Sequence, residues 1–246
     1  MRPGSAPADA DGTRDRLRQV AVDGARRLRS GGPDEATAQQ VVDWLAETFP
    51  PRAVAVACSM ADAALPRLVA DRIPGVDVLF LDTGYHFPET LATRDEVARA
   101  LDVRVVDVRA EQSVADQDAQ YGAGLHERDP GLCCRLRKVI PLQRALSGYE
   151  AWVTGVRREE SPTRAGTPLV AWDERNALVK VNPLAGWSFD ELIGYATDRR
   201  VPVNLLLTHG YPSIGCAPCT SPVAAGADPR SGRWAGQAKT ECGLHT

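Results

Sequence analysis

The sequence predicts an α/β protein in which a mostly parallel sheet has helices on both faces. Between about residue 53 and residue 154, short apolar runs of strand length alternate with segments of helical spacing. Such alternation is typical of a parallel sheet, because parallel neighbours need a crossover connection. After residue 202 the chain is rich in glycine and proline and has little periodicity. The last part of the chain is therefore expected to be an irregular tail.

The expected elements can be placed in order along the chain. Helical spacing occurs at 14–29 and 36–49, and a loop and cap signal at 31–34 precedes the second helix. Four strands are then expected at 53–58, 76–81, 103–108 and 150–154, with helices at 61–73, 88–101 and 134–147. Two short runs at 169–172 and 177–181 predict a hairpin. A helix at 188–199 is expected to start with Ser188 as N-cap and Glu191 three residues later.

Length and charge limit the class of protein. The 246 residues suffice for one large core, and 43% hydrophobic with 25% charged residues is ordinary for a soluble globular chain. A net charge of −3 predicts no bulk attraction to nucleic acid or to anionic membranes, so any anion site must be local. Neither a signal peptide nor a membrane span is evident. We expect a cytoplasmic protein with a disordered segment at 1–13, a single domain at 14–235 and a mobile tail at 236–246.

Two loops should lie beyond the carboxyl ends of the first two strands, where open α/β sheets bind ligands. The first, at 58–62, offers Ser59 and backbone N–H groups to a phosphate, although an ordinary capped turn fits the sequence equally well. The second follows at 82–86. Asp82 is a candidate acceptor for ribose hydroxyls or an adenine amino group, and His86 is expected to cap or pack.

An arginine-rich loop follows the fourth strand. Arg157, Arg158 and Arg164 crowd this segment, and guanidinium groups bind phosphate and sulfate bidentately. The alternative is a solvated charge run balanced by Glu159 and Glu160. The position after a strand favours a functional role for at least one of the arginines.

Four of the six cysteines form two close pairs. Cys133 and Cys134 are adjacent, and Cys216 and Cys219 form a Cys-x-x-Cys pair. In a reducing compartment, clustered thiolates favour a zinc or iron–sulfur centre over disulfides. Adjacent cysteines reach one compact centre only near a helix end or kink, and the preceding Pro-Gly supplies such a break. Lys138 lies one helical turn after the adjacent pair, facing either the centre or solvent.

The fifth cysteine stands alone near the end of the chain. Cys242 is flanked by Lys239 and His245, which are candidates for stabilising a thiolate. Cys58 ends an apolar strand and is expected to be a buried packing residue. Cys242 is therefore the candidate nucleophile.

These motifs strongly resemble the assimilatory adenylyl-sulfate reductases. The resemblance rests on Cys-Cys-x-x-x-Lys-Val at 133–139, Cys-x-x-Cys at 216–219 and the terminal Lys-Thr-Glu-Cys-Gly-Leu-His at 239–245. It runs from about residue 36 to the end, and the segments at 82–85 and 155–164 also fit. Related reductases that use 3′-phosphoadenylyl sulfate lack the two paired motifs. The resemblance therefore implies a [4Fe–4S] cluster and adenosine 5′-phosphosulfate as substrate.

The resemblance also implies the adenine-nucleotide alpha-hydrolase-like fold of the ATP pyrophosphatases. Their first loop reads Ser-Gly-Gly-x-Asp-Ser, whereas this chain has Cys-Ser-Met-Ala-Asp at 58–62, so ATP cleavage is not expected. By the same resemblance, Ser59 and Asp62 lie near the substrate. The cations expected around its phosphosulfate are Lys138, Arg157, Arg164, Arg230 and Arg233.

The implied reaction is attack by Cys242 on the sulfate sulfur, with AMP leaving and an S-sulfocysteine forming. Since no internal resolving cysteine is evident, thioredoxin or a similar dithiol is implied as the partner that releases sulfite. The chain is also a possible homo-oligomer. The alternatives are a 3′-phosphoadenylyl-sulfate reductase, an ATP-dependent sulfurtransferase acting on RNA, and a non-catalytic iron–sulfur or zinc sensor.

Overall fold

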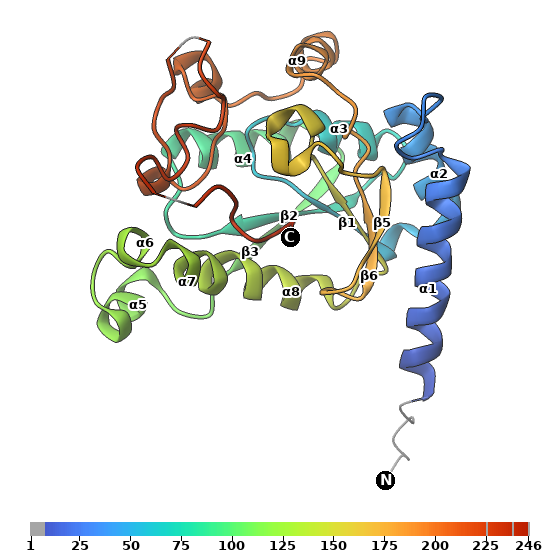
Figure 1. The fold of residues 1–246 in the computed structure, drawn as a ribbon, viewed down its shortest axis with the longest axis horizontal. Helices are drawn as coiled ribbons and strands as arrows, with labels where there is room; N and C mark the ends of the chain where they lie inside the picture. Colours follow the sequence, from blue (N-terminus) through green and yellow to red (C-terminus); the bar gives the residue numbers. More distant parts are fainter. Residues whose placement is uncertain (1–7, 225, 238, 246) are drawn as a thin grey trace.

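The computed structural model describes residues 8–224, 226–237 and 239–245, and these form a three-layer α/β structure (Figure 1). Its six-stranded sheet has the order β3-β2-β1-β4-β6-β5. Every neighbouring pair is parallel except β5 and β6, which form the expected antiparallel hairpin. The strands are β1 Val54–Ala57, β2 Val76–Asp82, β3 Val103–Arg109, β4 Ala151–Thr154, β5 Val170–Asp173 and β6 Leu178–Val181. The predicted fold class is confirmed.

The helices fall on both faces of the sheet, as the sequence predicts (Figure 1). They are α1 Ala8–Arg27, α2 Ala38–Thr48, α3 Ala64–Ala70, α4 Pro88–Ala100, α5 Val114–Tyr121, α6 Leu125–Arg128, α7 Pro130–Cys134, α8 Ile140–Leu146 and α9 Phe189–Asp198. Within the described residues, each helix is too short or too polar to cross a bilayer.

Two apolar clusters explain this layering. Alternate strand residues point to opposite faces, so Val54 and Val56 of β1 join the larger cluster with α1–α4 and α9, whereas Ala55 faces away from it. On that second face Trp152 of β4 is fully buried beside Leu142 and Leu146 of α8. The indole of Trp152 is thus the largest apolar group beneath α8.

The chain makes one change of direction across the sheet. From β1 it proceeds to β2 and β3 on one side, and then returns to place β4 on the other side of β1. The connections that leave β1 and β4 therefore diverge, and a crevice opens at the carboxyl ends of these two strands. This is the position at which doubly wound sheets bind their ligands.

Several boundaries differ from the sequence-based expectations. Helix α1 begins at Ala8, so residues 8–13 are helical where disorder was expected, and residues 1–7 lie outside the described residues. Helix α2 is capped by Thr37 in a capping box with Gln40, not by the 31–34 loop, because its side chain accepts from the Gln40 N–H. The predicted Ser188–Glu191 capping box of α9 is confirmed.

The cysteine-bearing helix departs most from expectation. It begins at Pro130, and between α7 and α8 its backbone widens into a π-helical turn, η2, at Arg135–Val139. π-turns insert one extra residue and commonly occur at functional sites. The adjacent cysteines are the last two residues before this irregular turn, which agrees with the predicted need for a helix end or kink.

Candidate active site

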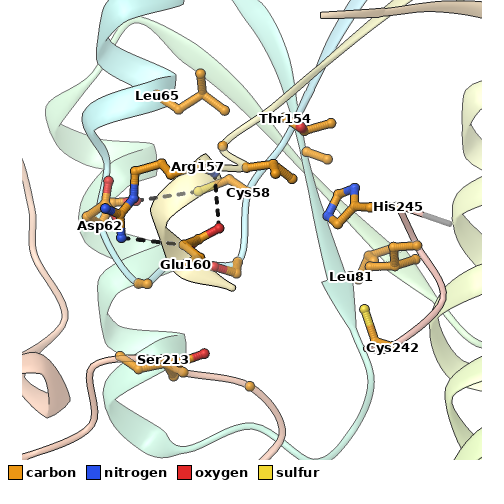
Figure 2. Close-up of a pocket in the computed structure, with 18 of the residues that line it drawn as sticks. Cys58, Asp62, Leu65, Leu81, Thr154, Arg157, Glu160, Ser213, Cys242 and His245 are labelled. Carbon is orange, nitrogen blue, oxygen red and sulfur yellow. Dashed lines mark hydrogen bonds and ion pairs between the residues drawn. The ribbon is translucent and has the colours of Figure 1, made fainter. Parts of the chain in front are cut away.

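A cavity of about 240 Å³ lies at the crevice between β1 and β4. It brings together eight residues that the sequence singled out: Ser59, Asp62, Lys138, Arg157, Arg164, Arg230, Arg233 and Cys242. Figure 2 shows Cys242 and His245 on one side of this cavity and Asp62, Arg157 and Glu160 on the other. Residues 180 positions apart in the sequence thus share one site, because Asp62 and Cys242 both line it.

Among the residues predicted to bind substrate or to act as nucleophile, Asp82 is the one that does not line the cavity. Its carboxylate is instead engaged at the end of β2. It forms an ion pair of 3.1 Å with Nε of Arg109 on the neighbouring strand and accepts from the Gly84 N–H at 3.1 Å. Asp82 therefore fixes the turn that follows β2. His86 packs as expected, since its ring lies on Phe80 with centroids 4.6 Å apart and its Nε2 lies 2.9 Å from the Leu81 carbonyl oxygen.

The loop after β1 forms the floor of the cavity. Oδ1 of Asp62 accepts from the Ala64 N–H at 2.9 Å, and burial raises the pKa of this carboxyl. Burial also raises the pKa of Cys58 to about 12, and its sulfur lies 3.4 Å from the Met60 backbone nitrogen. Cys58 is thus an un-ionised thiol that packs against the core as expected, although it is half-buried and lines the cavity, not fully buried. Ser59 lines the cavity but is exposed.

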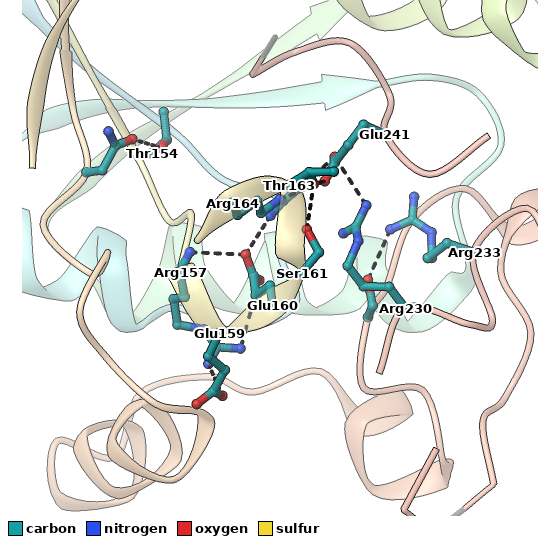
Figure 3. A network of polar contacts seen from close by, with 12 residues as sticks. Thr154, Arg157, Glu159, Glu160, Ser161, Thr163, Arg164, Arg230, Arg233 and Glu241 are labelled. Atoms are coloured by element: carbon teal, nitrogen blue, oxygen red, sulfur yellow. Dashed lines mark hydrogen bonds and ion pairs between the residues drawn. The ribbon is translucent and has the colours of Figure 1, made fainter. Parts of the chain in front are cut away.

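The arginine-rich loop after β4 is a network of ion pairs, drawn in Figure 3. Arg157 is buried against Phe189, with its guanidinium carbon 5.6 Å from the ring centroid, and donates to Glu159 at 2.9 Å. Arg164 donates to Glu160 at 2.5 Å. Both arginines therefore face the cavity with carboxylate partners already in place.

Two further arginines reach the cavity from the irregular segment that follows α9. Burial and the nearby Arg164 lower the pKa of Arg230, because a second cation stands close to it. Arg233 donates to the Ser213 hydroxyl at 3.3 Å and lies over the Trp234 ring, but its buried Nε has no partner among the described residues. Arg233 thus has spare capacity for an anion, whereas Nη2 of Arg230 already donates to Glu241 at 3.2 Å and to the Thr240 carbonyl oxygen at 2.8 Å.

The four paired cysteines line a second, smaller cavity. Three of them, Cys133, Cys134 and Cys216, are buried. Burial, and then the negative charge of the other three sulfurs, raises the pKa of Cys133 to about 12. Thiolates that share one cavity would repel one another, and a bound metal centre would relieve such repulsion.

The donor set of this cavity fits an iron–sulfur or zinc centre in its chemistry. Four sulfur ligands from two paired motifs are the usual complement of either centre. Within residues 8–224, 226–237 and 239–245, no three His, Cys, Asp or Glu side chains are already gathered in a metal-ligating arrangement. The structure therefore supports a shared location for the four cysteines.

Lys138 stands in the wall between the two cavities. Together with Thr83 and Cys216 it lines both of them. Burial disfavours its ammonium, but the charges of Cys216 and Cys242 outweigh burial and raise the pKa of Lys138. Burial likewise opposes ionisation of Cys216, yet Lys138 and the Thr83 hydroxyl, 3.3 Å away, lower its pKa. Lys138 faces the sulfurs, and the solvated alternative is wrong.

The terminal segment lies in the cavity. The His245 ring stacks on Trp152 at 5.8 Å with an interplanar angle of 13°, and Leu244 packs beside it. Burial and the neighbouring Lys180 lower the pKa of His245 to about 3, so the ring is neutral. His245 therefore anchors the tail and supplies no positive charge to Cys242. The cation whose pKa responds to Cys242 is Lys138.

Several residues of the site were missed in the sequence. Glu160 was considered only as a balancing charge and Glu241 only as part of the terminal motif, yet both carboxylates accept hydrogen bonds from Arg164. Arg137, on the π-turn, is buried beside the cysteine cavity and donates to the Gln117 side chain at 3.1 Å. A signal was present only for the two glutamates, in their nearness to the arginines and to Cys242.

Comparisons with known proteins identify the family of the chain. The phosphoadenosine phosphosulfate reductase domain model matches residues 52–222, and the chain belongs to this family. "Adenosine 5′-phosphosulfate reductase" of Streptomyces coelicolor is 53% identical over 233 residues, covering 95% of this chain and 96% of that protein. The protein of the same name from Mycolicibacterium smegmatis is 54% identical over 233 residues, with the same coverage.

Solved structures support the fold. A phosphoadenylyl-sulfate reductase from Candida auris, in a phosphate complex, superimposes with a TM-score of 0.63 at 27% identity, covering 91% of this chain and 100% of that one. The FMN adenylyltransferase of Candida glabrata, bound to FMN and an ATP analogue, has a TM-score of 0.56 at 11% identity, covering 90% of this chain and 79% of that one. The second likeness concerns the fold alone.

The approach of Arg233 to the cavity can be tested at Gly215. A Cβ at Gly215 would lie 2.1 Å from Nη2 of Arg233, so Gly215→Ala must push the guanidinium aside. We expect AMP binding to weaken by about tenfold, the effect of losing one charge-assisted hydrogen bond, as measured by calorimetry. Gly194→Ala is the matched control, since its Cβ meets nothing within 4 Å. Unchanged affinity in Gly215→Ala would contradict a role for Arg233 in anion binding.

Proposed function

We propose that this protein reduces adenosine 5′-phosphosulfate to sulfite and AMP, with Cys242 as the nucleophile. The observation that carries the proposal is the placement of Cys242 in one cavity with Lys138, Arg230 and Arg233, at the carboxyl ends of β1 and β4. The names of relatives that match over 95% of the chain support this substrate. Assimilatory sulfate reduction is the process in which such an activity operates.

In the first step the Cys242 thiolate attacks the sulfate sulfur. An S–S bond forms, the bond between that sulfur and the bridging phosphate oxygen breaks, and AMP leaves with the electron pair. The product on the protein is S-sulfocysteine. Attack brings a thiolate toward a substrate that already carries negative charge, so fixed cations lower the barrier.

Three cations are proposed to supply that stabilisation. The charge of Cys242 raises the pKa of Lys138, and Lys138 lines the cavity, where it can face the sulfate as the thiolate approaches. Arg230 and Arg233 retain N–H groups for the phosphate. Arg157 and Arg164 line the same cavity but already hold carboxylates. Ser59 and Asp62, on the floor, are proposed to contact the nucleoside.

In the second step an external dithiol releases sulfite. One thiolate attacks the Cys242 sulfur and sulfite leaves; the second thiol then attacks the mixed disulfide, restoring the Cys242 thiol. The dithiol supplies both electrons and becomes a disulfide. Cys58 cannot take this part, because burial raises the pKa of its thiol to about 12. Thioredoxin in the cytoplasm is the proposed dithiol.

A [4Fe–4S] cluster is the proposed occupant of the second cavity, held by Cys133, Cys134, Cys216 and Cys219. When bound, it supplies concentrated charge beside the substrate cavity and a rigid link between the two cysteine pairs. Lys138 and Thr83 orient Cys216 in the shared wall. The four cysteines thereby fix the position of Lys138 relative to the substrate.

The covalent intermediate is the most direct test. Adenosine 5′-phosphosulfate without reductant should add one SO₃ group to Cys242 and release one AMP, detectable by mass spectrometry of the C-terminal peptide. Cys242→Ser should form no adduct, because an alkoxide is hardly populated near neutral pH. Cys58→Ser is the control and should still form the adduct on Cys242. An adduct on Cys58, or full activity in Cys242→Ser, would overturn the mechanism.

The same assay separates the main alternative, a reductase for the 3′-phosphorylated substrate. That alternative draws on the name of the matching family and of the Candida auris structure. Sulfite release should be strongly selective for adenosine 5′-phosphosulfate over its 3′-phosphorylated form. Equal kcat/KM values for the two substrates would refute the proposed specificity.

The proposed cluster predicts a spectroscopic result. Protein purified without oxygen should show broad brown absorbance that is lost in Cys133→Ser and in Cys219→Ser, since each removes one of four thiolate ligands. Cys58→Ser should retain the absorbance, because Cys58 lies outside the second cavity. Stoichiometric zinc with no iron would contradict the assignment.

Lys138 gives a further test of the charge arrangement. Lys138→Met keeps the length of the side chain and removes its charge, so turnover should fall by at least about tenfold, while thermal unfolding changes little. Arg135→Ala, an exposed change on the same π-turn, should leave turnover near wild type. Normal turnover in Lys138→Met would mean that the ammonium plays no part in the reaction.

A further inference from the structure

The residue next to the proposed nucleophile makes the most extensive contacts of the described tail. The Glu241 carboxylate accepts two hydrogen bonds of 2.9 Å from Nε and Nη2 of Arg164, one of 3.2 Å from the Thr163 hydroxyl and one of 3.2 Å from Arg230 (Figure 3). Arg230 also donates to the Thr240 carbonyl oxygen at 2.8 Å. The loop after β4 and the segment after α9 thus both bind the chain immediately before Cys242.

Arg164 has no free nitrogen in this arrangement. Its third nitrogen, Nη1, donates to Glu160 at 2.5 Å. The side chains of Arg164 and Glu241 are 12% and 14% exposed, so the bidentate pair is largely shielded from solvent. A shielded, bidentate Arg–carboxylate pair is worth far more than a surface salt bridge. Arg164 is therefore committed to carboxylates while the tail lies in the cavity.

The tail is held on the other side of Cys242 as well. Arg175 donates to the Gly243 carbonyl oxygen at 2.5 Å, and His245 stacks on Trp152. Cys242 lies between these anchors and Glu241, so its sulfur is directed into the cavity from a chain fixed at both ends. Entropy otherwise lost when a flexible nucleophile is ordered is already removed by these contacts.

From these contacts we propose that Arg164 and Glu241 are positioning residues, which hold Cys242 in the cavity, and that Arg164 does not bind the substrate. The inference deepens the proposed function and rests on it. It separates the arginines of the site into two groups. Arg233 faces the anion, and Arg164, which also pairs with Glu160, binds the tail. Arg230 lies between the two groups, because it lines the cavity and its Nη2 also contacts the tail. Cys242 should consequently lose its fixed position when the Arg164–Glu241 pair is broken, although the nucleotide still binds.

The test measures the accessibility of Cys242 and nucleotide affinity independently. Cys242 should react with iodoacetamide about tenfold faster in Glu241→Gln than in the wild type, followed by mass spectrometry of the tail peptide. Arg164→Gln should produce the same increase, and the double variant no more than either single change, since one contact is lost in all three. The affinity for AMP, measured by calorimetry, should stay near wild type in each, while formation of the adduct slows.

Glu47→Gln is the matched control, because Glu47 forms an exposed ion pair with Arg27 away from the cavity. An unchanged alkylation rate in Glu241→Gln would overturn the proposal. So would weaker AMP binding in Arg164→Gln, which would make Arg164 a substrate ligand, or tighter binding in Glu241→Gln, which would make Glu241 a competing anion. If the proposed reaction is wrong, no adduct forms in any variant, yet the difference in alkylation persists.

Discussion

The two halves of the site depend on the electrostatic attraction between the Lys138 ammonium and the nearby cysteine sulfurs. Lys138 lines both the substrate cavity and the cysteine cavity, and the charges of Cys216 and Cys242 raise its pKa. A lysine placed away from solvent keeps its charge only where negative charge is close. Lys138 lies on the π-turn itself, directly after the helix that carries Cys133 and Cys134.

Charge balance explains why this cavity accepts its own tail. With the tail in place, Arg164 and Arg230 face two carboxylates, Glu160 and Glu241, so the four charges cancel. Lys138 and Arg233 remain outside this balance, and both can serve an anion while the tail is closed.

The sequence predicted the fold well because the signals for the sheet are local. Four strands appear as short apolar runs, and the capping box of Ser188 predicts the start of α9. Helices α5 and α6 were missed, since they are short and polar; only the capping box of Ser113 and Asp116 marks the first of them. The start of α1 was placed too late, because its first turn lacks apolar periodicity.

Residue type predicted which residues line the cavity better than it predicted which of them form hydrogen bonds and ion pairs with one another. Cysteines and arginines stand out by type, and nearly all those expected at the cavity line it. Which arginine serves which anion depends on contacts across more than seventy residues, as between Arg164 and Glu241, and no local pattern encodes them. Asp82 shows the same limit, because its partner Arg109 belongs to a neighbouring strand.

The position of Cys242 is set by contacts between the tail and other segments of the chain. Its own flanking charges do not hold it, because His245 is neutral against Trp152 and Lys239 lies over the Trp234 ring at 5.4 Å. The groups that act on Cys242 come from the π-turn and from the loops after β4 and α9. The docked tail therefore places the Cys242 side chain in the same cavity as the Lys138 ammonium, a contact that the local sequence around Cys242 does not encode.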